Sequence, residues 1–161
     1  MKKLRLYVDT SVFGGLFDTE STKRVNTAKQ FFQSVNKGVY EGFVSLLTIE
    51  EIIKAPNPIS EKLKDTISNY GFKILEETEE SLELSNAYIN NEAIPIKYRD
   101  DARHIAIGVY NEIDYIVSWN YRHMVNINVQ RLINSTNFKM GYSTIEIVSP
   151  EEVTGYGDVR I

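Results

Sequence analysis

The 161-residue chain contains no cysteine and only two histidines. Without cysteine there is no disulfide framework and no thiolate metal site, and two histidines argue against a histidine-rich metal centre. Any metal site in this chain would therefore be built from oxygen ligands. Oxygen ligands favour hard cations such as Mg²⁺ or Mn²⁺.

The chain also lacks a long apolar run. A membrane-spanning helix needs about 20 mainly apolar residues, and no stretch of the sequence reaches that length. The opening segment MKKLRLYV has too short an apolar stretch for a secretory signal peptide. We therefore expect a cytoplasmic protein with no membrane contact.

An excess of positive charge is missing as well. Lys and Arg number 18 against 22 Asp and Glu, which gives a formal net charge of −4. General nucleic-acid binders usually carry a basic excess, so tight nonspecific binding to nucleic acid is not expected, although a local basic rim is compatible with this total. The length and the 42% hydrophobic content predict a single domain over residues 1–161.

Short apolar runs alternate with segments of helical spacing along the chain. Strands are expected at residues 4–8, 42–45, 72–75, 114–118 and 145–148, and helices at residues 22–37, 47–54, 60–69, 79–91, 99–111 and 125–137. This alternation predicts an α/β fold whose central, mainly parallel sheet is covered by helices on both faces. Residues from about 150 to 161 are expected to form an extended tail.

Polar side chains follow two of the expected strands. Asp9 ends the run LRLYV, and Asn120 lies two positions after the strand at 114–118. Burying an unpaired carboxylate is costly, so Asp9 requires a partner or a role. Since ligands of such sheets bind beyond the carboxyl ends of the strands, we expect Asp9 and Asn120 to meet there.

Further acids stand at the starts of two expected helices. At about 100° per residue, Asp101 lies at the border of the apolar face of the helix at 99–111, whereas Asp100 points away and suits the helix N-terminus. In the helix at 47–54 the candidates are Glu50 and Glu51. The apolar border favours Glu50, but so short a helix does not decide between them. Carboxylates gathered in this way repel one another, and a divalent cation that relieves the repulsion would suit phosphodiester cleavage.

Four motifs in this order resemble the PIN-domain ribonucleases, which include the VapC-type toxins of type II toxin–antitoxin pairs. They are YVDTSV at 7–12, SLLTIEEI at 45–52, DARHIA at 101–106 and VSWNYRH at 117–123. The resemblance covers nearly the whole chain. It implies a PIN-like three-layer α/β/α sandwich and an acidic pocket that binds Mg²⁺ or Mn²⁺ and cleaves RNA.

The resemblance also assigns roles by position. It makes Asp9, Glu51 and Asp101 the acidic metal ligands, because the family places its second acid three residues after the threonine and before an aliphatic residue. It makes Asn120 an assisting residue of the same metal and catalytic site, at a position where many members carry aspartate. An amide carbonyl can ligate or orient water but brings no charge, which implies a one-metal site or low activity. The alternative is a weak or inactive PIN-fold module that binds RNA or protein. A homodimer and a cognate antitoxin are further expectations from the resemblance.

The residues next to the acids have two interpretations. Thr10 and Ser11 either hydrogen-bond a ligand carboxylate or, as we favour from sequence, provide the N-cap of the following turn. His104 and His123 are interpreted as structural and Trp119 as a core residue.

A candidate RNA rim flanks the expected pocket. RNA binding needs cations for phosphates and flat rings for bases, and the candidates are Lys97, Arg99, Tyr121 and Arg122. Two other α/β classes fit less well. A phospho-receiver domain needs two acids after its first strand, and a haloacid-dehalogenase-type phosphatase needs an acid where Ser11 stands.

Overall fold

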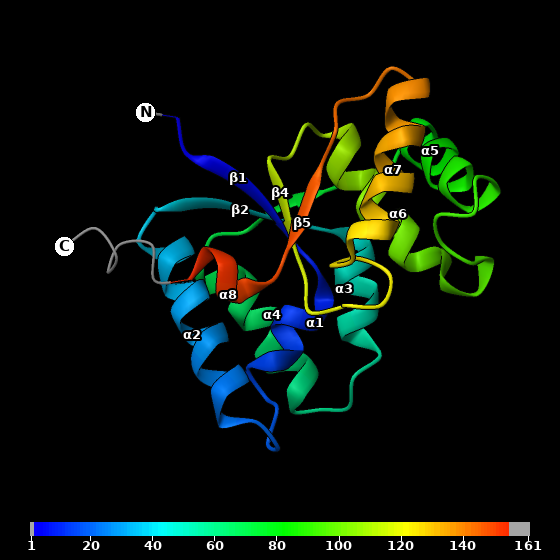
Figure 1. The fold of residues 1–161 in the computed structure, drawn as a ribbon. Coiled ribbons are helices and arrows are strands. Elements are labelled where there is room, and N and C mark those ends of the chain that lie inside the picture. The colour runs from blue at the N-terminus through cyan, green and yellow to red at the C-terminus, as the bar shows by residue number, and fades with distance from the viewer. Residues whose placement is uncertain (1, 155–161) are drawn as a thin grey trace.

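The computed structural model describes residues 2–154, and its centre is a sheet of parallel strands (Figure 1). The sheet order is β3-β2-β1-β4-β5, and all four pairings are parallel. The strands are β1 (Leu4–Val8), β2 (Tyr40–Ser45), β3 (Lys73–Leu75), β4 (Tyr115–Val117) and β5 (Glu146–Val148). The central position of β1 places the residue after it, Asp9, in the middle of the carboxyl edge of the sheet.

Helices connect successive strands, as parallel pairing requires. They are α1 (Thr10–Gly15), α2 (Thr22–Asn36), α3 (Leu46–Ile53), α4 (Ile59–Asn69), α5 (Glu79–Asn90), the 3₁₀ helix η1 (Ile96–Tyr98), α6 (Arg99–Tyr110), α7 (Ile127–Lys139) and α8 (Pro150–Val153). None of the helices within residues 2–154 is long and apolar enough to cross a bilayer.

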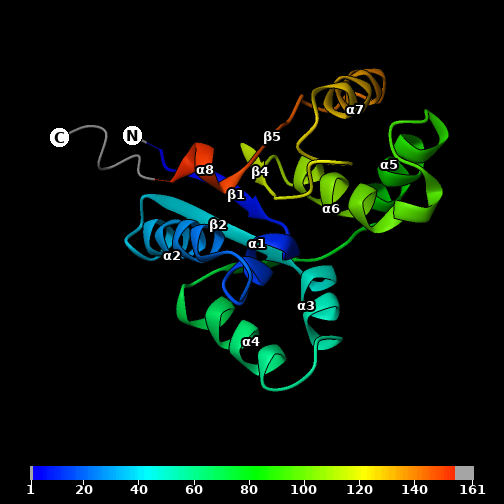
Figure 2. The same cartoon turned by 60° about the horizontal axis from the view of Figure 1, so that its bottom comes forward.

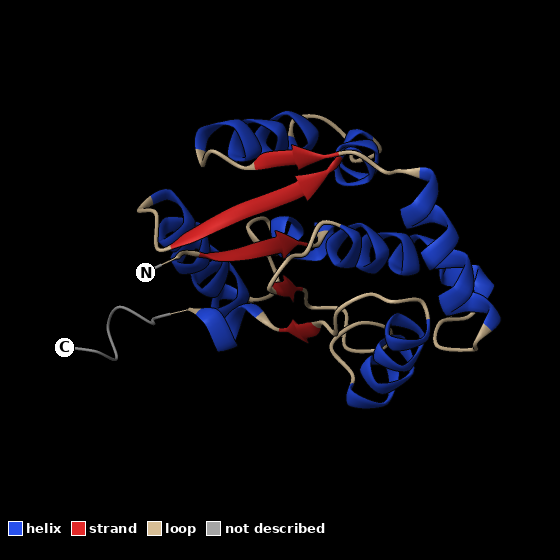
Figure 3. Cartoon of the chain, turned by 90° about the horizontal axis from the view of Figure 1, so that it is seen from above, coloured by secondary structure: helices blue, strands red, loops and turns tan. Residues whose placement is uncertain are grey.

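The helices form a layer on each face of the sheet (Figures 2 and 3). Side chains alternate along β1: Leu6 and Val8 pack with α1, α2 and α4, whereas Tyr7 packs with α5, α6 and α7. Both faces are therefore apolar, which explains why the strand sequences are almost continuously apolar. The predicted three-layer α/β/α sandwich with a parallel sheet is confirmed.

A close approach brings the segments after β1 and β4 together. Gly15, at the end of α1, lies under the indole of Trp119, so that a Cβ at position 15 would come within 2.1 Å of the ring. Trp119 is 5% exposed and belongs to the core, as predicted. The absence of a side chain at Gly15 thus lets α1 pack beneath the residue that precedes Asn120.

Three segments differ from the sequence prediction. The six-residue helix α1 and the short η1 were not expected, since neither is long enough to show a helical period. The tail predicted from residue 150 is wrong for residues 150–153. These form α8, whose first turn is closed by a capping box between Ser149 and Glu152, and the Tyr40 hydroxyl donates to the carbonyl of Val153 at 3.0 Å. Residues 155–161 lie outside the described part of the chain.

Candidate active site

The candidate acids come from separate segments that meet at the carboxyl edge of the sheet. Asp9 follows β1, Glu51 lies in α3 after β2, and Asp101 lies in the first turn of α6. Since β1, β2 and β4 are neighbours in the sheet, the residues beyond their ends are brought within reach of one another. The two residues predicted to meet here, Asp9 and Asn120, both contact Ser118.

Asp9 is buried and held on one side only. Its Oδ2 accepts hydrogen bonds from Ser11 Oγ at 2.7 Å, Ser118 Oγ at 2.9 Å and the Ser11 amide at 3.4 Å. Oδ1 accepts no hydrogen bond from the described residues, and it lies 3.8 Å from His104 Nε2. Asp9 is also the N-cap of α1, so the interpretation of Thr10 or Ser11 as that cap is wrong. Ser11 instead fixes the Asp9 carboxylate.

Glu51 rather than Glu50 lies beside Asp9. Thr10 Oγ1 donates to Glu51 Oε1 at 3.0 Å, and His104 Nε2 is hydrogen-bonded to the same oxygen. The Glu51 side chain is 29% exposed, whereas Glu50 points into solvent. The position chosen from the motif therefore faces the other acids, and the position favoured by the helical wheel does not.

His104 sits between the carboxylates and the core. Its side chain is 1% exposed, and its Nδ1 lies 2.6 Å from the Tyr7 hydroxyl. Burial disfavours the imidazolium, but the Tyr7 oxygen and the carboxylates of Glu51 and Asp9 outweigh it, so the pKa of His104 is raised well above its usual value. A charged His104 would offset part of the negative charge around Asp9.

Asp101 forms the opposite side of the site. Its Oδ2 accepts from Asn120 Nδ2 at 3.1 Å and lies 3.4 Å from His123 Nδ1. Burial and the negative charge of Asp9 raise the pKa of Asp101 above its usual 3.8, against the opposing effect of the Asn120 hydrogen bond. The two aspartates are therefore close enough to repel each other.

Asn120 is oriented by its own turn. Its Oδ1 accepts from the amides of Arg122 at 3.2 Å and His123 at 3.0 Å, which directs its amide nitrogen at Asp101. Both lone pairs of this carbonyl are engaged. In this arrangement Asn120 acts as a hydrogen-bond donor to Asp101 rather than as an open oxygen ligand.

The three carboxylates are suitable ligands for a divalent cation, although they are not yet spaced as in a formed metal site. Within residues 2–154, no group of three Asp, Glu or His side chains already has the arrangement of a metal site. The chemistry nevertheless fits, because Asp9 keeps Oδ1 open and a cation would relieve the repulsion that raises the pKa of Asp101. Asp9, Glu51 and Asp101 are the residues that could hold such an ion.

A cationic and aromatic cluster borders Asp101. The rings of Tyr98 and His123 lie 4.1 Å apart, and the charged groups of Arg122 and Lys97 lie 5.5 Å and 5.8 Å from the Tyr98 ring centre. Of the candidate rim, Lys97 and Arg122 are thus brought together beside the acids.

The other two rim candidates are not part of this cluster. Arg99 lines a separate 210 Å³ pocket between α5 and α6, and Tyr121 is 50% exposed on the surface.

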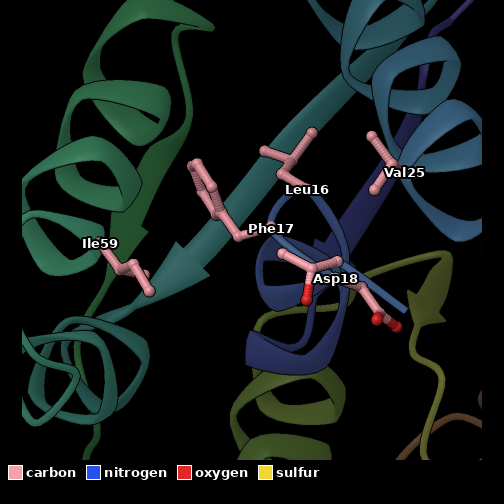
Figure 4. A pocket seen from close by; sticks show the side chains of 6 residues that line it. Leu16, Phe17, Asp18, Val25 and Ile59 are labelled. Carbon is pink, nitrogen blue, oxygen red and sulfur yellow. The ribbon is translucent and has the colours of Figure 1, made fainter. Parts of the chain in front are cut away.

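A second, largely apolar pocket lies away from the candidate acids Asp9, Glu51 and Asp101. It has a volume of about 370 Å³ and is lined by Leu16, Phe17, Asp18, Thr19, Val25 and Ile59 (Figure 4). Leu16 and Phe17 follow the C-terminal end of α1, whereas Asp9 caps its N-terminal end. None of the candidate site residues lines this pocket.

Sequence reasoning missed the contacts of Ser118, His104 and His123 with the acids, and that of Tyr7 with His104. His104 follows Asp101 by three residues, and residues three apart share a helix face, so the motif DARHIA contained a usable signal. The contacts of Tyr7 and Ser118 depend on strand pairing between distant segments, which a single sequence does not reveal.

Comparison with known proteins relates the chain by fold and not by sequence. No known family's sequence profile matches the chain, and no curated protein matches it in sequence. Among solved structures, the sarcin–ricin-loop-cleaving toxin VapC20 of Mycobacterium tuberculosis aligns with a TM-score of 0.58 and 14% identity, over 73% of this chain and 92% of that one.

Toxin–antitoxin complexes give similar matches. DNA-bound VapBC from Salmonella typhimurium aligns with a TM-score of 0.56 and 12% identity, over 91% of this chain and 98% of that one. A toxin–antitoxin complex from Klebsiella pneumoniae aligns with a TM-score of 0.54 and 18% identity, over 73% of this chain and 88% of that one. The chain therefore has the fold of the VapC-like PIN domains.

Proposed function

We propose that this protein is a divalent-metal-dependent endoribonuclease that acts as a VapC-like toxin. One observation carries the proposal: at the carboxyl edge of a VapC-like fold, buried Asp9 keeps one oxygen open, Glu51 shares its His104 neighbour, and Asp101 is close enough to feel its charge. Asp9, Glu51 and Asp101 would hold Mg²⁺ or Mn²⁺, and Asn120 would assist by orienting Asp101.

The chain's own residues prepare the site for cleavage. A bound cation would supply positive charge for the scissile phosphate and lower the pKa of an attacking water. Ser11 and Ser118 hold Asp9 Oδ2, which turns Oδ1 toward the other acids, while Thr10 holds Glu51. Lys97 and Arg122 lie over the Tyr98 ring beside Asp101, where they would neutralise RNA phosphates.

The charge of the site favours a single ion. The candidate cluster contains Asp9, Glu51 and Asp101, with neutral Asn120 where many family members carry a fourth acid. One divalent cation compensates most of three negative charges, whereas a second cation would be poorly compensated. The carbonyl of Asn120 is also occupied by backbone amides, so it contributes little to a second metal site.

An antitoxin partner and a homodimer complete the proposal. Two of the similar structures are toxin–antitoxin complexes, which supports a cognate antitoxin that shields the acids. We propose that the toxin and its antitoxin meet in the cytoplasm, where the RNA substrate is found.

A second candidate function is a PIN-fold module that binds RNA or protein without cleavage. Two features favour it: Asn120 in place of an acid, and the absence of a formed three-ligand cluster within residues 2–154. In this alternative the Tyr98, Lys97 and Arg122 cluster would bind RNA, and the acids would remain without a catalytic role.

The two functions separate in an RNA cleavage assay with Mn²⁺. We expect wild-type protein to cleave and Asp9→Asn to be slower by more than about 100-fold, because even indirect support of a metal ligand is worth 10–100-fold. Glu50→Gln is the matched control, since Glu50 is exposed and should leave the rate unchanged. Equal degradation by wild type and Asp9→Asn would point to a contaminating nuclease and contradict the proposal. RNA binding without cleavage would favour the second function.

A further inference from the structure

A chain of hydrogen bonds runs from the core to Glu51. Ser45 Oγ lies 2.7 Å from the Tyr7 hydroxyl, that hydroxyl lies 2.6 Å from His104 Nδ1, and His104 Nε2 is bonded to Glu51. Tyr7 and Ser45 are 0% exposed and His104 is 1% exposed. Burying several polar groups costs free energy of folding unless each of them has a hydrogen-bond partner. In residues 2–154, every buried side-chain nitrogen and oxygen is paired.

The carboxylate of Glu51, at the end of the chain, determines which atom donates in each of these hydrogen bonds. A carboxylate can only accept, so His104 Nε2 must donate to Glu51. In a neutral imidazole Nδ1 is then the acceptor, the Tyr7 hydroxyl donates to it, and Ser45 donates to Tyr7. In an imidazolium the bonds of Tyr7 and Ser45 reverse, but Nε2 still donates to Glu51. The contact with Glu51 is therefore the same in both charge states of His104.

The chain also joins the elements that carry the acids. Tyr7 lies in β1 two residues before Asp9, and His104 lies in α6 three residues after Asp101. Ser45 is the N-cap of α3, the helix that carries Glu51, and its Oγ accepts from the Thr48 amide at 3.4 Å. Ser45 is thus linked both to the start of α3 and, through Tyr7 and His104, to the carboxylate of Glu51.

We propose that Tyr7 and His104 are positioning residues that hold Glu51 beside Asp9 in readiness for a divalent cation, an inference that rests on the proposed function. His104 Nε2 contacts Glu51 and lies 3.8 Å from Asp9 Oδ1, so a single N–H lies between the two carboxylates. Glu51 lies on a short helix and is partly exposed, and without this contact the Thr10 hydroxyl would be the one remaining donor to its side chain among the described residues. Fixing a ligand before the metal arrives lowers the cost of binding it.

A purely structural role makes a different prediction. If the chain only stabilises the core, removing the Tyr7 hydroxyl would lower the melting temperature and leave metal affinity unchanged. Tyr88 offers a matched control, because it is also 0% exposed and its hydroxyl donates to Asn137 Oδ1 at 2.5 Å, a contact that includes none of the acids. Tyr7→Phe and Tyr88→Phe each remove one buried hydroxyl and keep the ring.

The test measures Mn²⁺ affinity by calorimetry, melting without metal, and RNA cleavage for the same variants. We expect Tyr7→Phe to weaken Mn²⁺ binding by about 10-fold and to lower kcat with little change in KM for RNA, since the effect acts through a metal ligand. Tyr88→Phe should melt lower than wild type and bind Mn²⁺ normally. His104→Leu should lose more affinity than Tyr7→Phe, and His104→Gln, whose amide can donate to Glu51, should recover part of it.

The outcomes distinguish a failure of the positioning role from a failure of the proposed metal-dependent function. Wild-type affinity for Mn²⁺ in both Tyr7→Phe and His104→Leu would overturn the positioning role, as would an equal loss in Tyr88→Phe. A wild-type protein that binds no Mn²⁺ would overturn the proposed function itself, and the positioning role with it. If Tyr7→Phe does not fold, the comparison of His104→Gln with His104→Leu decides, because only the glutamine can donate to Glu51.

Discussion

The two sides of the candidate site hold their acids in different ways. On the inner side, which consists of Asp9, Glu51 and His104, each carboxylate accepts two or more hydrogen bonds from side chains. On the outer side, Asp101 accepts one hydrogen bond, from Asn120, and lies near His123. On the inner side Asp9 and His104 are buried and Glu51 is partly exposed, and the outer side is bordered by exposed Lys97 and Arg122.

The two sides would therefore contribute differently to metal binding: one through the fixed orientation of its carboxylates, the other through its negative charge. The inner acids have their geometry fixed by neighbouring donors, so a cation would find them already oriented. On the outer side, burial and the charge of Asp9 raise the pKa of Asp101. A bound cation would relieve this repulsion, and the inner side would determine where the cation sits.

Disrupting the packing of Gly15 against Trp119 should have the largest effect on stability and on RNA cleavage. Gly15→Ala would place a methyl group 2.1 Å from the Trp119 ring, and such overpacking typically costs about 1–3 kcal/mol. We expect a lower free energy of unfolding in a urea titration, and slower RNA cleavage because the segment that carries Asn120 must shift. Gly14→Ala is the control: position 14 has no atom within 4 Å of an added Cβ, so its stability should be unchanged or slightly higher. Equal effects of both substitutions would contradict this role of Gly15.

Much of the fold could be predicted from the sequence, because its signals are local. The apolar runs and helical periods predicted the strands and the longer helices, and their alternation predicted the parallel sheet. The start of α7 was predicted two residues early, since Val125 is apolar but the cap is Asn126, which accepts from the amides of Asn128 and Val129. The short helices α1 and α8 depend on caps and packing that a hydrophobic period does not contain.

Adding a charge to the outer side should sharpen the contrast between the two sides. Asn120→Asp replaces a donor to Asp101 with a second negative charge, so the metal-free protein should melt lower. Mn²⁺ should bind more tightly, on the order of 10-fold, because affinity rises with ligand charge. Calorimetry and melting curves with and without Mn²⁺ measure both effects.

Asn126→Asp is the matched control for this change. It lies in the same loop, and an aspartate there can still cap α7, so neither melting nor Mn²⁺ affinity should change as they do for Asn120→Asp. A metal-free Asn120→Asp protein as stable as wild type, with unchanged Mn²⁺ affinity, would contradict the assigned role of Asn120.

The smallest effect is expected from removing the charge of Asp101. Its folded pKa is raised above the usual 3.8, so the folded state binds this proton more tightly than the unfolded state. Stability is therefore lost as pH rises from 3.8 through the raised folded pKa. Metal-free Asp101→Asn should melt higher than wild type above this range, by about 2–4 °C for each kcal/mol relieved.

The prediction for Asp101→Asn can be checked at low pH and against a neighbouring substitution. Below pH 3.8 the difference between Asp101→Asn and wild type should disappear, because Asp101 is then protonated in both states. Asp100→Asn, which removes the exposed partner of Arg103, should give no gain at any pH. A lower melting temperature for Asp101→Asn at neutral pH would contradict the repulsion between Asp9 and Asp101.

The candidate site could be predicted only in part. The acids follow expected strand ends or start expected helices, so Asp9 and Asp101 were identifiable, and the resemblance selected Glu51 where the helical wheel favoured Glu50. Thr10 and Ser11 were named from the sequence as candidate donors to a ligand carboxylate, and they hold Glu51 and Asp9. The donors Ser118 and His104 were not identified, because they reach Asp9 and Glu51 through tertiary packing. The actual orientation of Asn120 also depends on its own turn, since its carbonyl accepts from the Arg122 and His123 amides.

The most direct test of the account is a calorimetric Mn²⁺ titration of the wild type, Asp9→Asn, Glu51→Gln and Glu50→Gln. The account predicts one bound ion in the wild type and in Glu50→Gln, and affinities lower by more than about 10-fold in Asp9→Asn and Glu51→Gln. A wild-type protein that binds no Mn²⁺, or affinities that are equal in all four proteins, would contradict it.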